Sequence, residues 1–72
     1  MQQAEQNKLS ERHEELMGYQ LVTTAIKEAG VNRATYYRIL NGEVNPSAKT
    51  LKAILSAQKK VLTATKRELQ KA

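Results

Sequence analysis

The chain has 72 residues and carries 12 Lys and Arg against 7 Asp and Glu, a net charge of +5 at pH 7. It has no cysteine and one histidine, which excludes disulfides, thiolate metal sites and a zinc site built on histidines. This length suits one domain with a modest core, so oligomerisation is the remaining way to stabilise it. No apolar run could span a membrane and the start of the chain does not resemble a signal peptide, so we expect a cytoplasmic protein.

The first stretch, residues 1–7, is polar and rich in glutamine, and it predicts a flexible tail that is frayed or weakly helical. Ser10 is typical of a helix cap and predicts a first helix with Leu16 and Met17 as its apolar positions, ending at the first glycine. His13 stands among charged residues, so we interpret it as a solvated surface side chain.

Residues 19–29 predict a second helix, because their apolar side chains recur at helical spacing. The β-branched run 22–24 makes a strand the competing local interpretation. Strict alternation is missing, however, and the small side chains of Ala25 and Ala29 suit close packing between helices. The apolar stripe consists of Leu21, Val22, Ala25, Ile26 and Ala29.

The stretch that follows predicts a tight turn and a short third helix over residues 33–41. Gly30 suits the left-handed residue that ends a helix, because it has no Cβ to clash. Asn32 can cap the next helix with its side-chain oxygen, and Asn41-Gly42 is typical of a turn at the end of that helix.

The third helix has two distinct faces. Tyr36, Ile39 and Leu40 fall three and four apart and predict an inward stripe. The opposite face then carries Arg33, Ala34, Tyr37, Arg38 and Asn41. Two arginines, an amide, a phenol and a methyl group are suited to reading the edges of bases.

The rest of the chain predicts a loop and a long helix. Asn45 or Ser47 can cap this helix, and Pro46 is tolerated in its first turn. No glycine or proline follows, and a heptad seam runs through Leu51, Leu55, Gln58, Leu62, Thr65 and Leu69. A single helix would be about 35 Å long, too long to be covered by the earlier helices. Its distal part, residues 58–72, should therefore pair with another chain or fold back as a separate helix.

Together these elements predict an all-α fold of four to five helices with a long C-terminal helix. We expect a DNA-binding domain over residues 8–57 and a dimerisation extension over residues 58–72. The predicted dimer interface consists of Leu55, Gln58, Leu62, Thr65 and Leu69. Catalysis has little support, because no nucleophile–base pair, glycine-rich phosphate loop or cluster of metal ligands is present. We therefore predict a protein that is not an enzyme, with no cofactor, no metal and no evident small-molecule ligand.

Residues from about 20 to 57 resemble the helix-turn-helix domain of the Cro and lambda-repressor type transcription factors. The resemblance is carried by Ala29-Gly30-Val31, by residues 33–39, by Asn41-Gly42, and by Asn45-Pro46-Ser47 with the Thr50-Leu51 pair that follows. The chain departs from the family pattern at Ile26, at Val22-Thr23 where the family often has glutamine, and in the uninterrupted C-terminal helix.

The resemblance implies that the outer face of the third helix enters the major groove of DNA. The expected base-contacting residues are Asn32, Arg33, Ala34, Tyr37 and Arg38. The expected phosphate-contacting residues are Thr23, Lys27, Asn41, Ser47 and Lys49. Tyr36 is expected in the core.

The function predicted from the sequence is that of a homodimeric repressor from a phage, plasmid or other mobile element that binds a palindromic operator in double-stranded DNA. Repression is implied by the resemblance alone. The alternative is a basic helical interaction module, antitoxin-like or an adaptor, that binds an acidic protein or RNA through its lysine-rich C-terminal helix.

Overall fold

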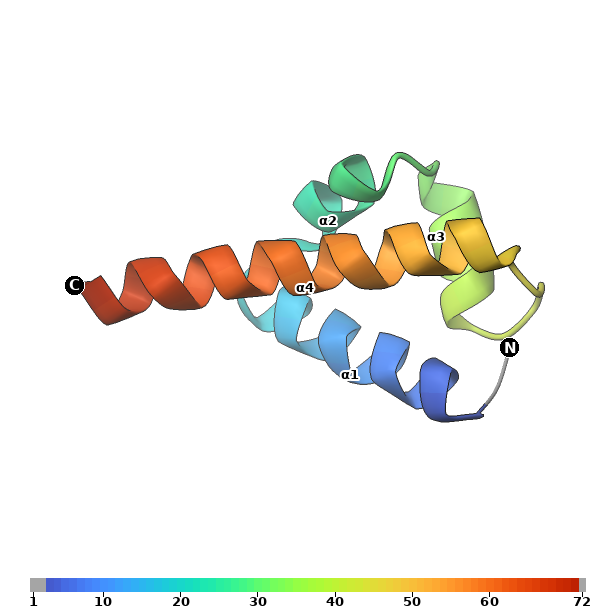
Figure 1. Cartoon of the computed structure of the whole chain (residues 1–72), viewed down its shortest axis with the longest axis horizontal. Coiled ribbons are helices and arrows are strands. Elements are labelled where there is room, and N and C mark those ends of the chain that lie inside the picture. Colours follow the sequence, from blue (N-terminus) through green and yellow to red (C-terminus); the bar gives the residue numbers. More distant parts are fainter. Residues whose placement is uncertain (1–2, 72) are drawn as a thin grey trace.

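The structure, a computed structural model, describes the backbone of residues 3–71. It confirms the predicted all-α fold with a long C-terminal helix (Figure 1). The four helices are α1 (Gln3–Gly18), α2 (Val22–Ala29), α3 (Arg33–Leu40) and α4 (Ala48–Lys71).

α4 is the helix around which the others pack. In Figure 1 α1 lies below it and α2 above it, while α3 stands behind its first turns. It is one continuous helix, and its C-terminal turns extend past the other three. The alternative prediction, that residues 58–72 fold back as a separate helix, is wrong. No glycine or proline interrupts this stretch, so the helix continues. Within the described residues no helix is long and apolar enough to cross a membrane.

α1 begins earlier than the sequence indicated. It includes most of the predicted flexible tail and starts well before Ser10. The early turns are held in place by tertiary contacts, because the Gln6 amide donates a hydrogen bond to the backbone carbonyl of Leu40, and Leu9 is buried. The composition of a polar stretch does not indicate tertiary contacts of this kind, so the sequence placed the start of the helix too late.

Two side chains of α1 lie on faces opposite to those predicted. His13 is 9% exposed, whereas the sequence interpretation placed it in solvent. Met17, predicted to pack inward, is 58% exposed. Leu9, His13 and Leu16 fall four and three residues apart and share the buried face, while Met17 lies at the flank of that face in the last turn of α1.

The core has two parts, which lie along the first half and the middle of α4. The first joins α3 to the first half of α4 and consists of Leu9, Ile26, Tyr36, Ile39, Leu51 and Ile54. The second joins the ends of α1 and α2 to the middle of α4 and consists of Leu16, Ala25, Val61 and Leu62. α3 is therefore fixed by contacts from all three other helices.

Candidate nucleic-acid interface

The turn between α2 and α3 has the geometry that its sequence predicts. Gly30 has a φ of 74°, and its N–H donates to the carbonyls of Ile26 and Lys27, each at 3.2 Å. Asn32 is extended, and its side-chain oxygen accepts a hydrogen bond from the Thr35 N–H at 2.8 Å. A left-handed glycine and a capping asparagine thus set where α2 ends and where α3 begins.

The cap of α3 gives a stability prediction. We expect Asn32→Ala to lower the free energy of unfolding by about 1 kcal/mol, because the Thr35 N–H loses its acceptor. Asn32→Asp retains a capping oxygen and serves as the control, so it should stay close to the wild type in thermal melts followed by circular dichroism. Equal losses in both variants would contradict the cap.

The inner face of α3 is anchored as the sequence indicated. Tyr36 and Ile39 are 1% and 2% exposed. The Tyr36 hydroxyl accepts a hydrogen bond from the Gln58 amide at 3.2 Å and lies 3.0 Å from His13 Nδ1. Burial raises the pKa of Tyr36 above its usual value of about 10, and the Gln58 hydrogen bond partly offsets this increase. α3 is therefore held by apolar packing and by one buried polar group.

Most of the outer face of α3 is open to a ligand. Four of the five residues predicted to lie there are exposed: Arg33, Ala34, Arg38 and Asn41. The Arg33 guanidinium donates from Nη1 to the Thr23 hydroxyl at 3.1 Å and lies 5.6 Å from the centre of the Tyr37 ring. Thr23 and Tyr37 thus restrict the directions in which Arg33 can point. Thr23, which is itself exposed, therefore has a second possible role: its hydroxyl accepts the hydrogen bond that orients Arg33.

Tyr37 is less accessible than predicted. Its ring is partly buried and meets the rings of His13 and Tyr36 edge to face, with centroids 5.7 Å and 5.4 Å away. Its position, one residue from the inward Tyr36 on a helix, places it on the flank between the two faces. Only the outer part of the side chain is available to a ligand.

The five candidate phosphate contacts, Thr23, Lys27, Asn41, Ser47 and Lys49, are all exposed. They lie on α2, at the end of α3 and at the start of α4. Ser47 also caps α4, because its hydroxyl accepts from the Thr50 N–H at 3.2 Å. The exposed amides of a helix N-terminus attract phosphate, so the start of α4 suits a backbone contact.

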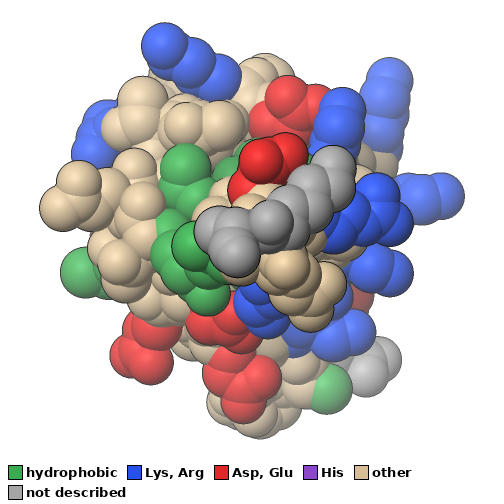
Figure 2. Space-filling view, turned by 90° about the vertical axis from the view of Figure 1, so that its left-hand side faces the viewer, with side chains coloured by type: hydrophobic (Ala, Val, Ile, Leu, Met, Phe, Trp, Pro, Cys, Tyr) green, Lys and Arg blue, Asp and Glu red, His purple; other side chains and the backbone are tan. Residues whose placement is uncertain are grey.

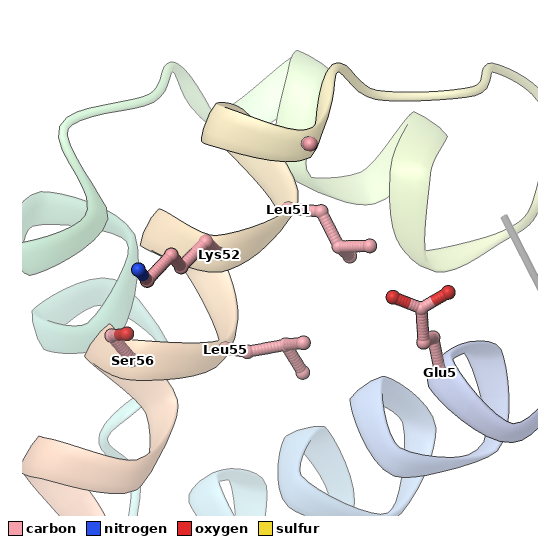
Figure 3. A pocket seen from close by; sticks show the side chains of 6 residues that line it. Glu5, Leu51, Lys52, Leu55 and Ser56 are labelled. Atoms are coloured by element: carbon pink, nitrogen blue, oxygen red, sulfur yellow. The ribbon is translucent and has the colours of Figure 1, made fainter.

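The predicted dimer seam is largely occupied by the chain itself. Gln58 and Leu62 are 0% and 6% exposed and pack against α1, so they are not open to a second copy. Leu55 is half-buried and faces α1 across a hollow of about 290 Å³, where Glu5 lies opposite (Figure 3). Thr65 is also half-buried, and Leu69 is exposed. A heptad pattern predicts a covered face, and here α1 and α2 cover it.

Sequence reasoning missed His13 and Gln58 as members of the buried polar group behind α3. Gln58 donates from its amide to the Leu9 carbonyl at 3.3 Å as well as to Tyr36. The spacing of His13 between two leucines at helical intervals was the signal that could have revealed its burial. For Gln58, the polar residue in the apolar seam was noticed, but its partners come from helices far away in the sequence.

Charge is unevenly spread over the surface. Figure 2, which views the molecule from the C-terminal end of α4, shows most of the visible Lys and Arg on its right-hand side and Glu both at the lower left and above the centre. One basic region is a hollow along α4 lined by Lys59, Lys60 and Arg67 together with small side chains. Lys60 there pairs with Glu28 at 2.5 Å. A second set of exposed cations, Lys27, Arg33, Arg38 and Lys49, belongs to α2, α3 and the start of α4.

Comparison with known proteins agrees with this geometry. Residues 24–57 match the family described as helix-turn-helix. The match starts in α2, contains all of α3 and ends within α4. Neither the search of curated proteins nor that of solved structures gave a match.

Proposed function

We propose that this chain, whose residues 24–57 match the helix-turn-helix family and resemble its Cro and lambda-repressor type, represses transcription by occupying an operator in double-stranded DNA. In this proposal α3 enters the major groove, and α2 and the start of α4 contact the backbone on either side. The observation that carries it is the exposed arginine pair, Arg33 and Arg38, on a short helix whose opposite face is anchored by Tyr36 and Ile39.

The proposed contacts fall into two classes. Arg33 and Arg38 donate to guanine O6 and N7, while Ala34 and the outer part of Tyr37 meet thymine methyl groups. Asn32 keeps its oxygen on the Thr35 N–H and offers only its amide hydrogens to a base. The residues Thr23, Lys27, Asn41, Ser47 and Lys49 hold the phosphate backbone and fix the register of the helix in the groove.

We propose that two copies bind together, so that two α3 helices enter successive major grooves of a palindromic operator. The overhanging end of α4 and its exposed Leu69 support a contact between copies. One exposed leucine offers far less apolar area than a stable dimer buries, so we expect the pair to assemble on the operator. The resemblance to the Cro and lambda-repressor type favours a regulator of a phage, plasmid or other mobile element that acts in the cytoplasm.

The test is selection of bound sites from a random duplex library. We expect enrichment of two inverted half-sites about 10 base pairs apart, centre to centre, because two-fold symmetry in the protein is mirrored in the operator. Binding to the selected site should weaken as salt rises and should stay tighter than binding to scrambled duplexes at each salt concentration. A single half-site would contradict the dimer, and no enrichment would contradict specific regulation.

The second candidate is a module that binds an acidic protein or an RNA. The basic hollow on α4, lined by Lys59, Lys60 and Arg67, is the observation that favours it. This candidate predicts binding that depends on salt without selecting a DNA sequence. Substitution of Arg67 would then weaken binding more than substitution of Arg33.

A further inference from the structure

A buried polar group links α1, α3 and α4 directly behind the recognition face. His13 Nδ1 lies 3.0 Å from the Tyr36 hydroxyl, and the Gln58 amide lies 3.2 Å from that hydroxyl on its other side. The same Gln58 nitrogen is 3.3 Å from the Leu9 carbonyl. Tyr36 precedes Tyr37, whose ring contacts both Tyr36 and His13. A change in this group is therefore transmitted to the helix that faces DNA.

The hydrogens in this group can be assigned by counting donors. The two hydrogens of the Gln58 amide go to the Leu9 carbonyl and to the Tyr36 oxygen. The Tyr36 hydroxyl then has its own hydrogen left, and this hydrogen donates to His13 Nδ1. All three of these hydrogens have an acceptor only when Nδ1 carries no hydrogen, as in a neutral imidazole.

Protonation of His13 reverses one of these bonds. Nδ1–H becomes a donor to the Tyr36 oxygen, so the hydroxyl hydrogen must find another acceptor. Gln58 Oε1 is buried and has no hydrogen-bond partner among the described residues, so it is the unused acceptor of the group. To reach it, the amide must turn over, and the bond from Gln58 to the Leu9 carbonyl is lost. The charged state therefore loses a hydrogen bond between α1 and α4, the two helices that hold Tyr36 of α3 between them.

The surroundings of His13 favour its neutral form. Burial lowers the pKa of His13 below its usual 6.5, and the adjacent Glu14 on the same helix partly offsets this effect. The groups that face it from α3 are the uncharged phenols Tyr36 and Tyr37, and α4 presents the neutral amide of Gln58. Stability contributed by the neutral ring is complete above pH 6.5 and is lost as pH falls through the lowered pKa, because the unfolded chain binds the proton first.

We propose that His13 and Gln58 are positioning residues for DNA recognition, and that protonation of His13 loosens the α1–α4 support behind α3 and lowers affinity for the operator. They act through the Tyr36 hydroxyl and do not touch DNA. The inference rests on the proposed function for its effect on binding, while its effect on α3 exists in the free protein. A regulator of this design binds its operator at neutral pH and leaves it under mild acidity.

The test begins with the free protein, where His13 is the only histidine, so its ring protons can be followed by NMR without overlap from another histidine. We expect the ring to titrate below pH 6.5, and the α3 amide signals to shift with the same midpoint. His13→Asn supplies an oxygen near the position of Nδ1 and does not titrate, so the α3 shifts should disappear in that variant. Titration at the ordinary pKa, or α3 signals that do not follow it, would overturn the proposal.

The second arm measures operator affinity against pH at constant salt. We expect the wild type to lose about fivefold or more between neutral pH and a pH below the His13 midpoint, a typical size for coupling between two sites. His13→Asn should bind equally at both pH values, and Tyr36→Phe, which removes the shared hydroxyl, should also lose the pH dependence. Tyr36→Phe keeps the ring in the core and decides the matter if His13→Asn does not fold.

The two arms separate the possible failures. If the wild type selects no DNA but α3 follows the titration of His13, the proposed function fails and the positioning role stands. If the wild type binds its operator with an affinity that does not change with pH, the role of His13 in binding is wrong while the function stands.

Discussion

Leu16→Ala is expected to lower the free energy of unfolding by about 2–5 kcal/mol, the usual cost of a large-to-small substitution in a core. Leu16 is 0% exposed and belongs to the second part of the core, with Ala25, Val61 and Leu62. A chain of this length has a total stability of about 4–11 kcal/mol, so the loss takes a large share of it.

The chain offers a matched control for this prediction. Leu69 lies on the same α4 seam as Leu62 but is 57% exposed, so Leu69→Ala removes the same atoms with little loss of buried area. Urea unfolding of both variants, followed by circular dichroism, measures the difference. Comparable losses would mean that Leu69 is buried in solution, and hence that α4 is covered there by another copy.

The recognition region could be predicted from the sequence because its determinants are local. Gly30 and Asn32 act on backbone groups within a few residues of themselves, and Tyr36 and Ile39 share a face by helix geometry alone. A turn and an amphipathic helix of this kind are specified by neighbours in the chain. The structure accordingly confirms the cap, the turn and the inward stripe.

The errors arise where partners come from distant parts of the sequence. In the sequence Gln58 is a polar residue that interrupts a heptad seam. In the structure its amide donates hydrogen bonds to the Leu9 carbonyl and the Tyr36 hydroxyl, 49 and 22 residues away. Periodicity indicates that a helix has a covered face without indicating what covers it. The same limit applies to His13, whose neighbours in the sequence are charged while its neighbours in space are aromatic.

The departure from the family pattern at Val22-Thr23 has a structural counterpart. Where the family often has glutamine, this chain has a β-branched pair whose Thr23 hydroxyl accepts a hydrogen bond from Arg33. Because threonine is shorter than glutamine, the long side chain in this contact is that of Arg33, on α3. In this chain the starts of α2 and α3 are thus joined by the Arg33–Thr23 hydrogen bond.

Arg33→Ala is expected to weaken binding to the selected operator by about 5- to 150-fold, which corresponds to the 1–3 kcal/mol of a bidentate arginine–guanine contact. Binding to scrambled duplexes should change far less, so the ratio between operator and scrambled DNA should fall. The reason is geometric. Arg33 is exposed at the start of α3, and its direction is limited by the Thr23 hydroxyl and the Tyr37 ring. A preoriented guanidinium loses less freedom on binding than a free one.

Two further substitutions separate base reading from charge. Arg67→Ala removes the same side chain from the basic hollow on α4, away from the residues proposed to contact DNA, and should leave the ratio between operator and scrambled DNA close to wild type. Lys49→Ala removes a proposed phosphate contact, so it should weaken all duplexes alike and reduce the salt slope by about one. Fluorescence anisotropy at several salt concentrations measures all three variants. If Arg33→Ala behaves like Lys49→Ala, Arg33 contacts the backbone, and sequence reading must pass to Arg38, the other exposed arginine of α3.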